Sequence, residues 1–169
     1  MRASIAALFL VASCRGGAER VAGTAPGAAV TDRDSTHGLV SCTPPSGATT
    51  TADVGPLGGV LSVGGVTVTI PESAVTLPTQ FTLRVPAGPL VEFEVVTSTS
   101  EHYQFPVPVT VSVDYGPLCG QGLDAKVLSV WNIDPDTKAL LENMGGVDDK
   151  LLHVITFVTT HFSGYAVAD

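Results

Sequence analysis

Alternation of apolar and polar residues is the feature that most limits what this chain can fold into. It is clearest in VTVTI at residues 66–70, QFTLRV at 80–85 and VPVTVSVD at 107–114. Because neighbouring side chains of a β-strand point to opposite faces, the pattern predicts strands with one buried and one exposed face. Further strands are predicted at residues 91–98, 126–134, 151–159 and 165–168. Gly64-Gly65, between VLSV and VTVT, predicts a tight hairpin turn.

About nine strands in residues 55–169, separated by short turns, predict an all-β fold, a two-sheet antiparallel β-sandwich. The composition agrees, since eighteen Gly and twelve Pro accompany many Val and Thr. A chain of 169 residues can bury one sizeable core, whereas two domains would each be small. Glu92 and Glu94 are expected on the outer face of their strand. Trp131, the only Trp, is expected in the core between the sheets.

The N-terminus has the layout of a secretory signal. Arg2 is followed by an apolar run at residues 5–11 and by VASC at residues 11–14. This tetrad resembles the bacterial lipoprotein box, in which the Cys is lipidated and becomes the new N-terminus. The resemblance implies a signal peptide at residues 1–13, a lipid anchor on Cys14 and a place in the bacterial cell envelope. The alternative is a fortuitous Cys in an ordinary or misassigned start.

Residues 14–54 are rich in Gly, Ala, Thr, Pro and Ser and have almost no large apolar side chain. They are expected to form a flexible, disordered tether, with the sandwich at residues 55–169. With Cys14 lipidated, Cys42 and Cys119 remain as an even pair, which predicts a disulfide in an oxidising compartment. The alternative is a pair of free or metal-binding thiols, but neither Cys has a Cys or His nearby at ligand spacing.

The formal net charge is −8, and residues 55–169 hold twelve acidic and four basic residues. A surface of this sign repels nucleic acid and anionic membranes, so no nucleic-acid partner is expected. Contact with a membrane is expected only through the lipid on Cys14. No cofactor is predicted, because the P-loop and dinucleotide fingerprints are absent. No metal is predicted, because the histidines at 37, 102, 153 and 161 show no ligand spacing. Asp134 and Asp136 lack the Gly of a calcium loop and are expected in a charged turn, and Asp148-Asp149 in a solvated hairpin.

Four stretches, in this order, resemble the ZU-five domain of zonula-occludens proteins, netrin receptors, ankyrins and bacterial envelope relatives. They are GGVLSVGGVTVTIPESAV at residues 58–75, FPVPVTVSV at 105–113, SVWNIDPDTKALLE at 129–142 and THFSGYAVA at 160–168. The similarity spans about residue 55 to the end. One departure is IPESA at residues 70–74, where the family usually has Ile-Pro-x-Gly-Ala. The resemblance implies a β-sandwich used as an interaction or structural module rather than as an enzyme.

The resemblance also makes His161-Phe162-Ser163 a candidate site. In some family members, within death-domain signalling proteins, a His-Phe-Ser at the end of the domain is self-cleaved between Phe and Ser. By the same chemistry the Ser163 hydroxyl would attack the Phe162 carbonyl, His161 would assist proton transfer, and water would resolve the ester. This needs a strained peptide bond and hydrogen-bond donors for the oxyanion. Otherwise the triplet is part of the last strand.

Three functions follow as hypotheses. The first is an envelope lipoprotein whose non-catalytic sandwich binds another envelope protein or has a structural role. The second is a self-processing domain that cuts between Phe162 and Ser163. The third is a lipoprotein that binds carbohydrate or cell-wall polymer in a loop pocket lined by Trp131.

Overall fold

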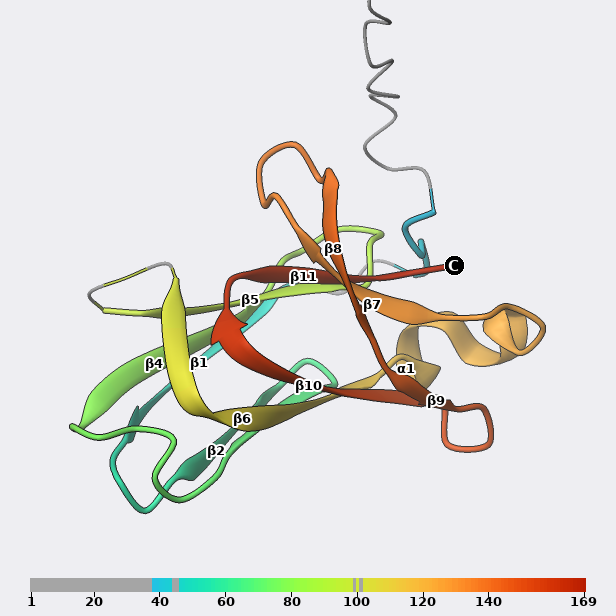
Figure 1. Ribbon diagram of the computed structural model, residues 1–169. Coiled ribbons are helices and arrows are strands. Elements are labelled where there is room, and N and C mark those ends of the chain that lie inside the picture. The colour runs from blue at the N-terminus through green and yellow to red at the C-terminus, as the bar shows by residue number, and fades with distance from the viewer. Residues whose placement is uncertain (1–37, 44–45, 99, 101) are drawn as a thin grey trace, which may run out of the picture. The chain divides into compact units, whose positions relative to one another are not determined.

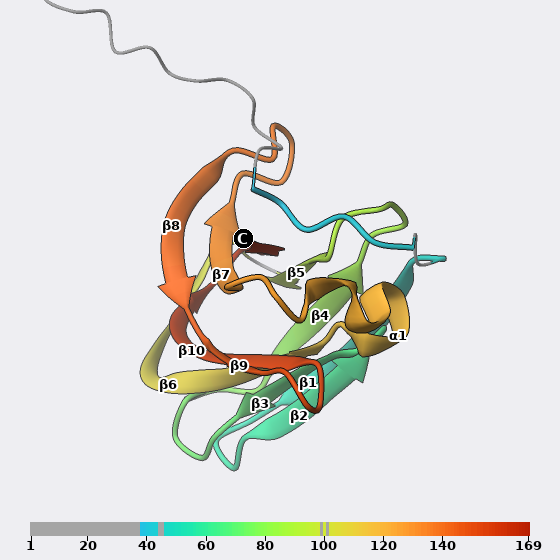
Figure 2. The ribbon, with the colours of Figure 1, turned by 90° about the vertical axis from the view of Figure 1, so that its right-hand side faces the viewer.

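The structure, a computed structural model, describes residues 38–43, 46–98, 100 and 102–169. They form the predicted two-sheet antiparallel β-sandwich (Figures 1 and 2). The predicted signal peptide, Cys14 and most of the predicted tether lie outside this range. The described part contains eleven strands rather than about nine, and a short helix α1 and a 3-10 turn η1. The elements are β1 Ala48–Val54, β2 Gly59–Val63, β3 Val66–Ile70, β4 Thr79–Val85, β5 Glu92–Thr97, β6 Tyr103–Asp114, α1 Gly116–Cys119, η1 Gly120–Leu123, β7 Ser129–Ile133, β8 Leu140–Gly145, β9 Val147–Asp149, β10 Val154–Phe162 and β11 Gly164–Ala168.

The chain passes repeatedly between the two sheets. One sheet has the order β1-β4-β5-β11-β7-β8 and the other β2-β3-β6-β10-β9. Within the described residues the chain therefore changes sheet six times, between β1 and β2, β3 and β4, β5 and β6, β6 and β7, β8 and β9, and β10 and β11. At the corner between β8 and β9, Gly145 and Gly146 have φ of 70° and 133°, values that favour glycine. A Cβ on Gly146 would also lie 3.0 Å from the side chain of Ile155, so this corner needs a residue without a side chain.

The alternation seen in the sequence appears as alternating burial. In β3, Val66, Val68 and Ile70 are buried, whereas the two threonines between them are not. The Gly64-Gly65 hairpin is confirmed, because Val63 pairs with Val66 and the two glycines have φ of 58° and 84°. Positive φ at both central residues matches the right-handed twist of the flanking strands.

The structured part of the chain starts earlier than the predicted boundary at residue 55. Residues 48–54, expected in the tether, form β1 and pair along their whole length with β4. Leu39 and Val40 are also buried, and the Val40 amide donates to Val167 O at 2.8 Å. A threonine-rich segment with little apolar area cannot form a core alone, but β4 offers a complete ladder to which it can add. The prediction failed because this pairing partner is distant in sequence.

Trp131 is not in the core between the sheets. Val130 and Asn132 of β7 face inward, whereas Trp131 and Ile133 lie on the outer face of the six-stranded sheet. There Trp131 is half-buried in a second apolar cluster with Leu39, Ile133, Ala166 and Ala168. Its indole nitrogen donates to Ser129 Oγ at 3.0 Å. Leu39, which the sequence placed in the tether, belongs to this cluster. It therefore helps to cover Trp131 on the outer face of the sheet.

Candidate functional site

The triplet His161-Phe162-Ser163 lies at the corner where β10 passes into β11 (Figure 1). The ladder between β10 and β6 shifts register between Thr159 and His161, so a bulge directly precedes the corner. The corner is enclosed, with Phe162 0% and Ser163 7% exposed. The Ser163 carbonyl accepts from the Val95 amide of β5 at 3.1 Å. Both sheets therefore hold the peptide on either side of the candidate bond.

Asn132 connects the two polar side chains of the triplet. Its Nδ2 lies 3.1 Å from Nε2 of His161 and 2.5 Å from Oγ of Ser163. An amide nitrogen has two hydrogens to donate and no lone pair to offer, so both atoms accept from Asn132. Nε2 of His161 therefore carries a lone pair, and Nδ1 carries the proton. Nδ1 faces Thr159 Oγ1 at 3.5 Å.

Two hydroxyl groups hold the backbone carbonyl of His161. Thr159 Oγ1 donates to His161 O at 2.9 Å, and the Tyr165 hydroxyl donates to the same oxygen at 2.5 Å. Burial raises the pKa of Tyr165 above its ordinary value, against the smaller opposing effect of hydrogen bonds with Thr159 and Ser163. The phenol therefore stays protonated and remains a donor. The position of the His161 main chain thus does not depend on Asn132.

Phe162 anchors the residue before the candidate bond in the core. Its ring centroid lies 4.6 Å from that of Phe105 and 5.8 Å from that of Phe81, with both pairs edge to face. Such pairs add to the stabilisation that comes from burying the rings. Packing of the Phe162 side chain therefore holds the corner against the core of the sandwich.

The corner holds the groups named by the self-cleavage hypothesis in a non-reacting arrangement. Nε2 of His161 accepts from Asn132, and the Thr159 and Tyr165 hydroxyls donate to His161 O rather than to the Phe162 oxygen. The non-glycine residues with positive φ in the described chain are Ser73, Lys138 and His153, so the triplet is not held in that strained region.

Asn132 and Thr159 were not among the residues singled out in the sequence. A signal was present for Asn132, because it shares the inward face of its strand with Val130 and is polar. A polar group on such a face needs a hydrogen-bond partner. The identity of that partner depends on tertiary structure, because Asn132 pairs with Tyr165 across β7 and β11 and so lies beside the corner.

Cys42 and Cys119 form the disulfide that the cysteine count predicted. Their Cα atoms are 4.9 Å apart, and 77 positions separate them in the sequence. The bond joins the segment before β1 to α1. Next to it the Cys42 amide donates to Pro89 O and the Thr43 amide to Leu118 O. The N-terminal segment is thus fixed to the sandwich by covalent and hydrogen bonds together.

Asp134 begins a charged turn, as expected. Its carboxylate accepts from the amides of Asp136 and Thr137 at 3.0 and 2.8 Å. The backbone hydrogen bond from Thr137 is the largest of the causes that hold the pKa of Asp134 below its usual value. The carboxylate thus caps its own turn. Among the described residues, no group of three or more His, Cys, Asp or Glu side chains could hold a metal ion.

Asp148 is not the solvated carboxylate that the sequence suggested. It accepts from the Tyr115 hydroxyl at 2.8 Å and pairs with Lys150 at 2.6 Å. Tyr115 is fully buried, and burial is the first cause that raises its pKa above the usual value for tyrosine. The prediction failed because Tyr115, distant in sequence, packs under the β9–β10 hairpin. This group fixes the base of that hairpin.

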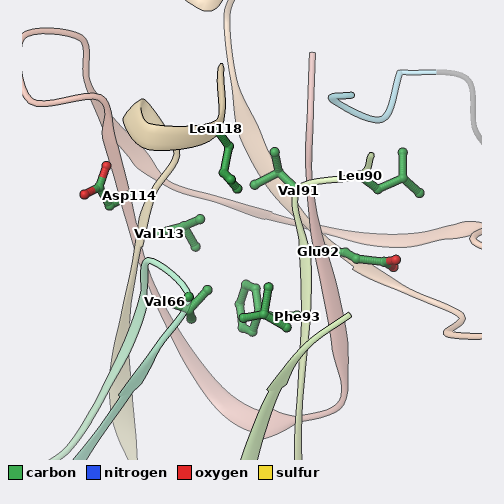
Figure 3. Close-up of a pocket in the computed structure, with 10 residues that line it drawn as sticks. Val66, Leu90, Val91, Glu92, Phe93, Val113, Asp114 and Leu118 are labelled. Carbon is green, nitrogen blue, oxygen red and sulfur yellow. The ribbon is translucent and has the colours of Figure 1, made fainter. Parts of the chain in front are cut away.

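A small apolar pocket lies between the sheets at the end that α1 covers (Figure 3). Its labelled lining includes Val66, Val91, Phe93, Val113 and Leu118, which come from both sheets and α1. The volume of about 10 Å³ suits roughly one water molecule. A small organic ligand does not fit there without rearrangement of the core.

No helix in the described residues is long and apolar enough to span a bilayer.

The chain matches no model of a known protein family. It also matches no curated protein. Unrelated proteins of many functions share the β-sandwich architecture, so the fold alone identifies no family. The likeness to ZU-five domains therefore stays a prediction that rests on the four sequence stretches.

Proposed function

We propose that the chain is a bacterial envelope lipoprotein, anchored through Cys14, whose sandwich is a non-catalytic module that binds another envelope protein. The order of signal sequence, cysteine and tether supports the anchor. A disulfide is typical of an oxidising compartment such as the envelope. The small size of the pocket between the sheets supports binding through the outer surface.

The observation that carries the proposal is a set of exposed apolar side chains on the β9–β10 hairpin. Leu151 and Leu152 are 93% and 69% exposed, and Val147 of β9 is 77% exposed. The Asp149 carboxylate accepts from the amides of both leucines, at 3.0 and 3.1 Å. The Lys150 ammonium ties the turn to Leu123 O at 3.0 Å. Exposed apolar side chains that form a contiguous patch mark sites of contact with other molecules.

We expect a photo-crosslinking residue at position 151 to capture one envelope protein in intact cells. The same residue at position 57 is the matched control. Leu57 is 88% exposed on the turn between β1 and β2, at one end of β2. The Gly64-Gly65 turn lies at the other end of β2, where Gly65 O accepts from the Asp114 amide, and Asp114 pairs with Val154 beside the β9–β10 hairpin. Position 57 is therefore about as exposed as position 151 but lies at the opposite end of β2 from the hairpin. Gel shift and mass spectrometry identify the product.

A Cys14→Ala variant serves as the control for the anchor. It should leave the membrane fraction and lose the crosslinked product, because both require the protein to be held at the membrane. Equal crosslinking from positions 151 and 57 would contradict a specific surface at the hairpin. Continued membrane partitioning of Cys14→Ala would contradict the lipid anchor.

A second candidate function is self-processing, which is favoured because His161 Nε2 and Ser163 Oγ lie at the same corner, both within hydrogen-bond distance of one atom, Asn132 Nδ2. The product would be the fragment 163–169, which includes all of β11. Because β11 pairs with both β5 and β7, the fragment would stay bound until the protein is denatured. Mass spectrometry of the denatured protein is therefore the measurement. Cleavage predicts a chain ending at Phe162, absent from Ser163→Ala, whereas full-length mass alone would exclude processing of the unmodified protein.

A further inference from the structure

The Asn132 side chain hydrogen-bonds both the nucleophile and the base of the candidate self-cleaving corner. It is 8% exposed and lies on β7, which pairs with β11 on one side and with the edge strand β8 on the other. A single nitrogen, Nδ2, donates one hydrogen to His161 Nε2 and one to Ser163 Oγ. The amide therefore takes the place of a direct hydrogen bond between serine and histidine.

This placement has a defined chemical effect. A general base must accept the proton of the attacking hydroxyl, so Nε2 needs its lone pair directed at Ser163 Oγ. That lone pair accepts from Asn132 instead. The serine oxygen also accepts from Asn132, at 2.5 Å, which lowers its electron density for attack. Both reacting groups are thus present, and each is hydrogen-bonded to Asn132.

We propose that Asn132 is a latch that keeps the Phe162–Ser163 bond intact, so that cleavage starts only when this amide withdraws. The inference rests on the self-processing candidate function. The remaining contacts support it, because Thr159 and Tyr165 hold the His161 carbonyl, and Thr159 faces its Nδ1, independently of Asn132. Removal of the amide therefore leaves the histidine in place with its Nε2 lone pair free.

The released reaction balances without a cofactor. The Ser163 hydroxyl proton moves to His161 Nε2 as Oγ bonds to the Phe162 carbonyl carbon. The carbon–nitrogen bond then breaks, and the imidazolium returns the proton to the Ser163 nitrogen, which leaves an ester and a free amine. Water hydrolyses the ester, so that Phe162 gains a carboxylate and the Ser163 hydroxyl is restored. Hydroxylamine in place of water would give a hydroxamate on Phe162.

The test compares substitutions of Asn132 in the full chain by mass spectrometry after denaturation. Asn132→Ala should raise the rate of cleavage at least ten-fold over the unmodified protein, and hydroxylamine should trap its ester. Asn132→Ser is the companion variant, since one hydroxyl proton cannot serve both acceptors. Asn132→Asp is the matched control of equal shape and should not cleave, because its carboxylate accepts from Ser163 and favours a protonated His161. Asn132→Ala combined with Ser163→Ala should stay intact.

The outcomes separate the latch from self-processing itself. Cleavage in the unmodified protein that slows or stops in Asn132→Ala and Asn132→Ser would overturn the latch and leave self-processing standing. Full-length mass in the unmodified protein and in both folded variants would overturn the latch and self-processing together. Circular dichroism and a cooperative melt establish that each variant is folded. An increase in folded Asn132→Ala that the isosteric Asn132→Asp does not show identifies the latch.

Discussion

Removal of the Cys42–Cys119 disulfide should lower the free energy of unfolding by about 4 kcal/mol. The bond closes a long loop, across 77 positions, and so restricts the unfolded chain strongly. The variant is Cys42→Ser with Cys119→Ser, and urea denaturation followed by circular dichroism gives the free energy. The unmodified protein under reducing conditions should match it. An unchanged midpoint would contradict a stabilising role for the bond.

The same substitution should loosen the segment before β1 selectively. Val40 and Cys42 both donate amide hydrogen bonds to the sandwich, to Val167 O and Pro89 O. Hydrogen exchange at these two amides should accelerate more than at Val68 of the buried β3 strand. Equal acceleration at all three positions would indicate a global loss of stability instead.

Phe162→Ala should cost about 3–5 kcal/mol, since it removes a fully buried ring from a packed aromatic cluster. The cavity would lie directly beside the Phe162–Ser163 peptide bond, at the corner between the two sheets. Urea denaturation measures the loss. Leu77→Ala is the control, because Leu77 is 73% exposed and its truncation should change stability by about 0.5 kcal/mol at most. Similar effects of the two substitutions would show that the aromatic cluster does not stabilise the corner.

Where the sequence predicted structure correctly, the signal was local. The strands at Val66–Ile70 and Thr79–Val85 and the turn at Gly64-Gly65 follow from period two and from positive φ at glycine. Their side chains face the core on one side only, so the pattern is visible along the chain. The cysteine pair was also predictable, since it depends on a count rather than on geometry.

Two of the errors share a physical cause. Residues 48–54 looked like tether because they have few apolar side chains, yet β4 pairs with them along their whole length. Trp131 was assigned to the wrong face because a second apolar cluster, which includes Leu39 and Ala166, covers the outer side of its sheet. In both cases the partner lies far away in the sequence. Residues 140–145 and 147–149 differ, because they form edge strands that are largely exposed and so lack a clear alternation.

The sequence alone determined the β class of the protein, its hairpin at Gly64-Gly65, the cysteine pair and the location of His161-Phe162-Ser163 near the end. Only the tertiary structure decided that this triplet forms a buried corner between two sheets and that Asn132 reaches it. The reason is that strand patterns record which side chains face inward, whereas strand order and register decide which of them meet. Asn132 and Ser163 are 31 positions apart and come together because β7 pairs with β11.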